Sequence, residues 1–185
     1  PFGYQKVLAW SDAFEGRDVS LVFDGAMADA VVYLNGEKVA AHPDGYTPFE
    51  ARLTEHLRRG GNLVTVRIDG SENPEIPPFG GQIDYLTYAA LYREVHLRVT
   101  APHWIANVKI ETPEPLRAER SVRARVMLAG EGRDASIMAR LVGPDGNEVA
   151  MASVAVGGAE TVVAFDDLSG LRLWCPGDPA LYRLD

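Results

Sequence analysis

The chain has 185 residues, of which 46% are hydrophobic, and its formal net charge is −8. A chain of this size buries about 70% of the surface of its unfolded state, which excludes intrinsic disorder but allows either one large domain or two small ones. The negative charge repels phosphate backbones, and Arg58-Arg59 is the only adjacent basic pair, so nucleic acid is not expected as a partner.

Cysteine content and hydropathy exclude further classes. Cys175 is the only cysteine, which rules out an intramolecular disulfide and a zinc site built from several thiolates. No apolar run approaches the roughly 20 residues of a membrane-spanning helix, so no membrane partner is expected. Pro1-Phe2-Gly3 does not begin a signal peptide, and because residue 1 is not methionine, an earlier signal could have been removed. The compartment therefore stays open.

The first clear element is a hairpin over residues 30–40. Its strands read AVVYL and EKVAA, and Asn35-Gly36 between them supplies the positive φ angles that a type I′ turn requires. A short helical connector is predicted next, with Thr54 as its N-cap and Gly60 as its end.

Two later runs predict strands with one apolar face each. Residues 64–68 read VTVRI and residues 95–99 read VHLRV, so apolar and polar side chains alternate in both. Because successive side chains of a strand point to opposite faces, the valines, Ile68 and Leu97 are expected to face a core.

A domain boundary is predicted at Thr100-Ala101-Pro102, where one strand stops and a second series of alternating runs begins. The series reads WIANVKIE, SVRARVMLA, DASIMARLV, EVAMASVAV and ETVVAF, with the turn Pro144-Asp145-Gly146 between the third and fourth runs. The sequence thus predicts an all-β chain with two sandwich domains, residues 1–100 and residues 101–185, of which the second is immunoglobulin-like.

No local motif for catalysis is present, because a glycine-rich phosphate loop, an HExxH helix and a GxSxG elbow are all absent. The acidic loop at residues 69–75 lacks the ligand spacing of an EF-hand, which favours a solvated turn over a calcium site. The histidines have no metal-ligand spacing and are expected in surface or packing roles. They are His42, His56, His96 and His103.

The aromatic residues allow two interpretations. Phe79 lies in the loop IPPFGG at residues 76–81, where prolines stiffen the backbone and glycines permit close approach of another surface. Phe79 either stacks on a sugar or packs against its own sandwich, and inward packing is favoured. The tryptophans Trp10, Trp104 and Trp174 are expected in the core rather than as ligand platforms.

Two long stretches resemble the glycoside hydrolase family 2 enzymes, which include β-galactosidases, β-glucuronidases and β-mannosidases. Residues 19–54 are similar to the sugar-binding jelly roll of that family, and residues 173–184, LWCPGDPALYRL, resemble the ending of the immunoglobulin-like domain that follows it. The matching pieces are Phe23-Asp24-Gly25, Asn35-Gly36, Gly45-Tyr46, Pro48-Phe49 and Trp174. The resemblance implies a jelly roll truncated at its N-terminus, residues 1–100, and an immunoglobulin-like sandwich truncated at its C-terminus, residues 101–185.

The most informative stretch is IDYLTYAALYREV, in which Asp84 precedes Arg93 by nine residues. The resemblance implies that Asp84 reaches into the active site of a catalytic barrel, where it contacts the terminal sugar and, in some members, a sodium ion. A carboxylate suits this task because it accepts charge-assisted hydrogen bonds from two hydroxyl groups. The alternative is that Asp84 caps a turn after Gly80-Gly81. Arg93 is expected to hold the loop from a buried position by donating to several carbonyls.

Two departures from the family limit the likeness. Ala89-Ala90 stands where members often carry a small residue followed by glycine, so the local backbone is expected to differ. An asparagine that some members use near the sugar would precede Pro1.

The resemblance implies a parent enzyme that hydrolyses β-glycosides with retention, through two glutamates about 5 Å apart on a barrel of about 250 residues. Because Asp84 resembles an aspartate of the family's β-galactosidases, galactosides are the substrate class that the resemblance favours. The chain itself is expected to be inactive, to shape the active-site rim and to support the barrel. Its expected partners are that barrel, in the same polypeptide, and a β-galactoside or related carbohydrate. No cofactor is expected in the chain, sodium or magnesium is the cation expected in the parent, and a homo-oligomeric parent is compatible with the family.

Two other functions remain as alternatives. The same jelly roll could serve as a free-standing carbohydrate-binding module or lectin. The sequence favours an excised piece, because it stops after Leu184 and leaves the last expected strand unformed or short. A pair of cell-surface adhesion domains is weaker still, since such domains usually depend on disulfides.

Overall fold

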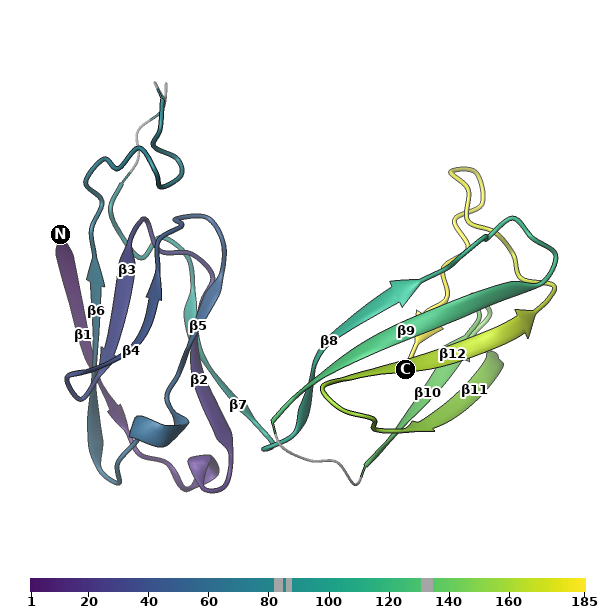
Figure 1. The fold of residues 1–185 in the computed structure, drawn as a ribbon, viewed down its shortest axis with the longest axis horizontal. Coiled ribbons are helices and arrows are strands. Elements are labelled where there is room, and N and C mark those ends of the chain that lie inside the picture. The colour runs from purple at the N-terminus through teal and green to yellow at the C-terminus, as the bar shows by residue number, and fades with distance from the viewer. Residues whose placement is uncertain (82–84, 86–87, 131–134) are drawn as a thin grey trace. The chain divides into compact units, whose positions relative to one another are not determined.

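The computed structural model describes residues 1–81, 85, 88–130 and 135–185, and it is all-β, as predicted (Figure 1). The chain divides into two compact units, Pro1–Ala101 and Pro102–Asp185. In the described ranges, the helices are the short 3-10 turns η1 (Asp12–Phe14) and η2 (Thr54–His56). No helix in those ranges is long and apolar enough to cross a membrane.

The N-terminal unit is a jelly-roll sandwich of two antiparallel sheets. Its strands are β1 (Phe2–Ala9), β2 (Asp18–Phe23), β3 (Ala30–Leu34), β4 (Glu37–His42), β5 (Phe49–Arg52), β6 (Gly61–Ile68) and β7 (Val95–Thr100). One sheet has the order β1-β6-β3-β4 and the other has the order β5-β2-β7. Between them lies a core that includes Phe23, Leu34, Leu53 and Ile68, all fully buried.

The C-terminal unit is the immunoglobulin-like sandwich. It contains β8 (Trp104–Glu111), β9 (Arg120–Ala129), β10 (Ser136–Val142), β11 (Glu148–Ala155), β12 (Glu160–Leu168) and β13 (Arg183–Leu184). The sheets are β12-β9-β8 and β11-β10-β13, so the five predicted strands are confirmed and the two-residue strand β13 joins them. The predicted turn joins β10 to β11, with the N–H of Gly146 donating to the carbonyl of Gly143 at 3.0 Å.

The predicted hairpin is confirmed in detail. Strands β3 and β4 meet at the pair Leu34–Glu37, and the turn residues Asn35 and Gly36 have φ angles of +53° and +89°. Positive φ at both central positions is the signature of a type I′ turn, which glycine and asparagine accept more readily than other residues.

The predicted helical connector is wrong in its cap and its length. The turn η2 ends at His56 rather than near Gly60, and Thr54 lies inside it rather than before it. The hydroxyl group of Thr54 is engaged elsewhere, because it accepts a hydrogen bond from the N–H of Val19 at 2.9 Å and donates to Asp18 at 2.8 Å. A side chain tied to strand β2 cannot also cap the turn.

The apolar faces of the two alternating strands have different environments. On β6, Val64, Val66 and Ile68 are buried, as predicted. On β7, Val95 and Val99 pair with the buried Phe23 and Val19, so this row faces the core side as predicted, but Val95, Leu97 and Val99 are still 36%, 37% and 39% exposed. The reason is topological, because β6 is an inner strand whereas β7 is an edge strand.

The prediction that the tryptophans lie in the core is also wrong. Trp174 is 58% exposed, and Trp10 and Trp104 are half-buried. Trp10 lies at the surface of its unit, where it contacts Phe14 edge-on and the guanidinium of Arg59 lies 5.6 Å from its ring centre. A large amphipathic ring at the rim of a small sandwich satisfies hydrophobic contact without complete burial.

Asn62 is a fully buried polar side chain that joins the hairpin to the start of β6. Its Nδ2 donates to the carbonyl of Arg58 at 2.9 Å, and its Oδ1 accepts from the N–H of Arg58 at 2.8 Å and from Asn35 Nδ2 at 3.0 Å. Asn35 in turn accepts from the N–H of Leu63 at 3.0 Å. Because buried backbone groups need partners, Asn62 stabilises this end of the sandwich.

Replacing Asn62 with alanine should destabilise the N-terminal unit by about 2–4 kcal/mol, because the backbone groups of Arg58 would lose their buried partner. Calorimetry would show a lower Tm for that unit. Asn73→Ala is the control, since Asn73 is exposed and, among the described residues, its side chain bonds the N–H of Glu75 in its own turn. Equal effects from the two substitutions would contradict this role of Asn62.

Candidate functional site

Three connections of the N-terminal unit meet at one end of the sandwich. Phe23, at the end of β2, pairs with the first residues of β5 and β7, and Ala30, at the start of β3, pairs with the last residues of β4 and β6. The β2–β3, β4–β5 and β6–β7 connections therefore emerge together, at the upper end of this unit in Figure 1. We call this region the loop end, and it comprises residues 24–29, 43–48 and the described residues of 69–94.

The first and third of these connections are joined by backbone hydrogen bonds. Met27 and Ala90 form an isolated antiparallel bridge, each donating its N–H to the carbonyl of the other at 3.0 Å. The N–H of Asp24 donates to the carbonyl of Glu94, also at 3.0 Å. These bonds hold the two connections side by side across a separation of more than 60 residues in sequence.

Close packing accompanies this bridge at Ala89-Ala90. A Cβ atom built on Gly70 would lie 2.1 Å from the Cβ of Ala89, a contact that no side chain at position 70 could relieve without moving the backbone. Gly70, which has no side chain, therefore leaves room for Ala89 at this point.

Arg93 ties the first connection to the second. Its Nη1 donates to the carbonyls of Asp24 at 3.3 Å and Tyr46 at 3.1 Å, and its guanidinium carbon lies 5.1 Å from the centre of the Tyr92 ring. The side chain therefore contacts two loop carbonyls, but it is exposed, so the buried position expected from the sequence is wrong. Because the guanidinium is exposed, those of its N–H groups that face solvent can donate to water, and they do not need acceptors from the protein.

Tyr92 also contacts the second connection. Its hydroxyl group donates to the carbonyl of Gly45 at 2.7 Å. Gly45 itself packs on Met27, since a Cβ there would lie 2.4 Å from the Met27 sulfur, and a Cβ on Gly25 would lie 2.9 Å from the Tyr92 hydroxyl oxygen. The glycines of the sequence motif thus allow the three connections to approach closely.

Two tyrosines complete the described part of the loop end. The hydroxyl groups of Tyr46 and Tyr85 share a hydrogen bond of 3.0 Å, and the rings are 37% and 53% exposed. This hydrogen bond raises the pKa of Tyr46 to about 12. On the same connection the backbone N–H of Tyr46 holds the pKa of Asp44 below its usual range, through a 2.7 Å hydrogen bond.

The acidic segment and Phe79 belong to the third connection, which follows β6. Asp69 and Asn73 each accept a hydrogen bond at 3.1 Å from the backbone N–H two residues later, as solvated turns do. Phe79 is half-buried and lines a cleft of about 300 Å³ together with Asp29 and Asp69. Within the described ranges, no three His, Cys, Asp or Glu residues are placed to hold a metal ion.

The predicted site residues fall into three places. Gly45, Arg93 and Phe79 belong to the loop end, whereas Asn35 and Gly36 lie in the hairpin turn at the opposite end of the same sandwich. Asp84 lies outside the described residues. Sequence reasoning did not predict the roles of Tyr46, Tyr85 and Tyr92. The sequence shows only that these tyrosines lie within the motif stretches of the second and third connections. Trp174 is on the C-terminal unit.

The histidines take surface roles. The ring of His42 stacks on Phe49 with centres 4.6 Å apart and is hydrogen-bonded to Thr47 at 2.9 Å. His56 pairs with Glu37 at 2.7 Å. His96 and His103 are exposed on the second sheet and at the start of the C-terminal unit, respectively.

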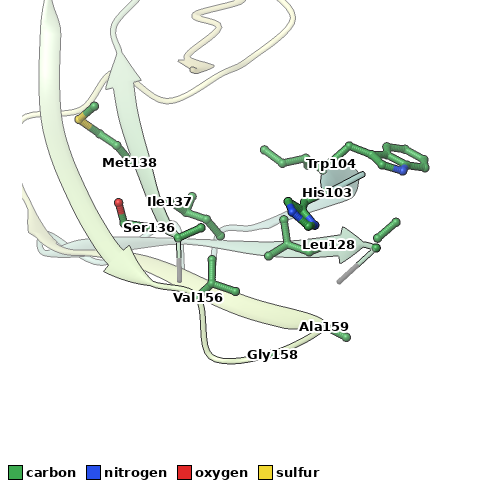
Figure 2. Close-up of a pocket in the computed structure, with 13 residues that line it drawn as sticks. His103, Trp104, Leu128, Ser136, Ile137, Met138, Val156, Gly158 and Ala159 are labelled. Atoms are coloured by element: carbon green, nitrogen blue, oxygen red, sulfur yellow. The ribbon is translucent and has the colours of Figure 1, made fainter. Parts of the chain in front are cut away.

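A pocket of about 890 Å³ lies in the C-terminal unit, between residues of β8, β9 and β10 (Figure 2). Its walls are mainly apolar, with side chains such as Leu128, Ile137 and Val156, and the indole ring of Trp104 points away from them. Among the described residues that line it, His103 is the only one with a titratable side chain. The described residues of its lining therefore offer no pair of acidic groups for glycosidic bond cleavage.

The tyrosine pair leads to a test by titration. Replacing Tyr85 with phenylalanine should lower the pKa of Tyr46 from about 12 towards its ordinary value of about 10, measured from phenolate absorbance at high pH. Because the pKa is raised in the folded chain, the contact stabilises the fold fully below pH of about 10, and this contribution is lost as the pH rises through about 12. Tyr88→Phe, at an exposed position nearby, should leave the Tyr46 titration unchanged. If Tyr85→Phe left the pKa of Tyr46 unchanged, the hydrogen bond between the two hydroxyl groups would be contradicted.

Comparison with known proteins places these features in a family. The sequence matches glycosyl hydrolases family 2, sugar binding domain, over residues 3–102. It is 44% identical to a β-galactosidase from Rhizobium meliloti over all of this chain and 25% of that protein, and 33% identical to a β-galactosidase from Thermoanaerobacterium thermosulfurigenes over 98% of this chain and 26% of that protein. A putative β-glucuronidase from Formosa agariphila is 27% identical over 98% of this chain and 22% of that protein.

Solved structures share the fold. The structure of a putative β-galactosidase from Bacteroides fragilis superposes with a TM-score of 0.81 over 98% of this chain and 29% of that chain, at 24% identity. A β-glucuronidase from Bacteroides uniformis gives a TM-score of 0.79 over 98% of this chain and 24% of that chain, also at 24% identity. The chain spans about a quarter of the length of the curated relatives that it matches. It belongs to glycoside hydrolase family 2, and its N-terminal unit is the sugar-binding domain of that family.

Proposed function

We propose that the chain is the non-catalytic N-terminal part of a retaining glycosidase that acts on β-galactosides, and that its loop end forms part of the active-site rim. The observation that carries this proposal is the bracing of three connections by Arg93 and Tyr92 in a unit that matches the family's sugar-binding domain. A rim must be rigid before the sugar arrives, because each ordered contact then costs less binding free energy.

The names of the relatives support galactosides as the substrate class. The two relatives reported above at 44% and 33% identity are named β-galactosidases, whereas the one at 27% is named a putative β-glucuronidase. A neutral sugar also fits the described surface, because the loop end presents the rings of Tyr46 and Tyr85 and the half-buried ring of Phe79. Exposed aromatic rings offer an apolar face and hydroxyl groups to a carbohydrate.

We assign Asp84 the direct sugar contact. Asp84 directly precedes Tyr85, whose hydroxyl group is hydrogen-bonded to Tyr46 on the neighbouring connection. A carboxylate in this segment would accept hydrogen bonds from two hydroxyl groups of the terminal sugar. Phe79, from the same long connection, would contact an apolar face of the sugar. Arg93 would position this segment without touching the substrate, through the carbonyls that it binds.

The reaction itself would take place on a barrel contributed by the rest of the polypeptide. In a retaining mechanism, one glutamate attacks the anomeric carbon while the other protonates the leaving oxygen, and water then releases the sugar with the second residue acting as base. A sodium ion in the parent would obtain one oxygen ligand from Asp84, and magnesium is the other cation expected there.

The role of Asp84 can be tested in the full polypeptide. Asp84→Ala should leave the fold intact and lower kcat/KM for a nitrophenyl β-galactoside by about tenfold to a hundredfold, the effect of losing one or two charge-assisted hydrogen bonds. Glu72→Ala is a matched control, because Glu72 is an exposed carboxylate in the same connection and should leave the kinetics unchanged. Unchanged kinetics in the Asp84 variant would overturn the assignment.

A further inference from the structure

Both polar atoms of the Asn35 side chain have hydrogen-bond partners in the folded chain. Its Oδ1 accepts from the N–H of Leu63 at 3.0 Å, and its Nδ2 donates to the carbonyl of His56 at 3.2 Å and to Asn62 Oδ1 at 3.0 Å. The backbone N–H of Asn35 also donates to the carbonyl of Leu63, at 2.8 Å. These bonds tie the turn between β3 and β4 to η2 and to β6.

The partners determine which atom of the amide lies on which side. The N–H of Leu63 is only a donor, and the carbonyl of His56 is only an acceptor. Asn62 Oδ1 already accepts a hydrogen bond from the N–H of Arg58 at 2.8 Å, so it too faces Asn35 as an acceptor. The position of Asn35 Nδ2 is therefore lined by two acceptors and requires a donor.

Asn35 is also followed by Gly36, and this is the only Asn-Gly pair in the sequence. Gly36 is exposed, a Cβ built on it would have no neighbour within 4 Å, and it has no side chain to hinder its backbone nitrogen. Such a nitrogen can attack the asparagine side chain that precedes it. The reaction converts the asparagine into aspartate or isoaspartate.

The reaction has two steps and consumes only water. The nitrogen of Gly36 loses its proton and bonds to Cγ of Asn35, while the bond from Cγ to Nδ2 breaks and Nδ2 takes up a proton and leaves as ammonia. Water then opens the succinimide ring that has formed. Addition at Cγ gives aspartate, and addition at the backbone carbonyl carbon of residue 35 gives isoaspartate.

The hydrogen bonds of the folded chain oppose this reaction. Cγ must become tetrahedral and Nδ2 must accept a proton, whereas both hydrogens of Nδ2 are engaged with acceptors and Oδ1 is held by Leu63. The amide must leave these partners before it reacts, which requires local opening of the turn. A process that requires opening proceeds in proportion to the open fraction, as amide hydrogen exchange does.

The products do not fit the site that held the amide. An aspartate carboxylate has no hydrogen to donate, so the oxygen in place of Nδ2 would face the His56 carbonyl and Asn62 Oδ1 without a hydrogen bond. Asn62 is fully buried, so water cannot replace the lost donor there. Isoaspartate lengthens the backbone by one atom, whereas the pair Leu34–Glu37 leaves room for two ordinary residues in the turn.

We propose that Asn35 is a deamidation site that the folded N-terminal unit protects, and that deamidation of an unfolded chain prevents it from regaining the full stability of that unit. The change is irreversible because ammonia is lost. The hairpin turn lies at the end of the sandwich opposite the loop end, so the modification would act on the stability of the unit and not by contact with the rim.

Mass spectrometry of the purified chain tests the protection. Chain in mildly alkaline buffer is compared with chain in the same buffer with guanidinium chloride, and the mass gain from amide to carboxyl is followed on the peptide that contains Asn35. Deamidation should be at least about tenfold slower in the folded chain. In denaturant, Gly36→Ala should slow the reaction, because its Cβ hinders the attacking nitrogen. Equal rates in folded and denatured chain, or no effect of Gly36→Ala in denaturant, would overturn the proposal.

Asn35→Asp reproduces one product and tests the effect on stability. It should lower the Tm of the N-terminal unit by about 5–15 °C. Asn73→Asp is the matched control, because it makes the same change at an exposed position and the new carboxylate can still accept from the N–H of Glu75. Equal Tm values for the two variants would overturn the proposal. Failure of Asn35→Asp alone to fold would support it, and the comparison of rates in the unsubstituted chain does not depend on that variant.

Discussion

Antiparallel pairing around β2, β3 and β6 is the constraint on which the loop end depends. Because these strands alternate in direction, the connections that follow β2, β4 and β6 must all emerge at the same end of the sandwich. Their backbone groups then crowd together and need partners that the sheets cannot supply. The bridge between Met27 and Ala90, the guanidinium of Arg93 and the hydroxyl group of Tyr92 supply them.

In the proposed enzyme, these contacts would explain how a non-catalytic domain serves a glycosidase. Arg93 and Tyr92 come from the third connection and hold the first and second connections through backbone carbonyls, so the restraint does not depend on which side chains the rim presents. The side chains at the rim are then free to specify the ligand. In the proposed enzyme, Asp84 and the neighbouring aromatic rings would contact the sugar, while the barrel would carry out the chemistry.

The sequence predicted those parts of the fold that local chemistry determines. Asn35-Gly36 has few alternatives to a type I′ turn, and the alternation on β6 matches an inner strand. Tertiary context decided the rest. Thr54 bonds Asp18 instead of capping a helix, because strand β2 lies within reach only in the folded unit. The exposure of Leu97 follows from the edge position of β7, which alternation alone does not reveal.

The candidate site was less accessible to sequence reasoning than the fold. Gly45 and Arg93 could be singled out from motif pieces, but the hydrogen bond between Tyr46 and Tyr85 joins residues 39 positions apart and has no sequence signature. The role of Asp84 rests on family resemblance, since Asp84 lies outside the described residues. The loop end of the N-terminal unit carries the proposed sugar contact.

The central claim is that the chain contributes a rim to a site completed elsewhere, and the isolated 185-residue chain tests it most directly. Purified chain should not turn over nitrophenyl β-galactoside, and titration with galactose should give a Kd above the millimolar range, because an open half-site cannot enclose a sugar. Turnover that survives purification, or galactose binding with a sub-millimolar Kd, would contradict the claim. The second result would favour a free-standing lectin instead.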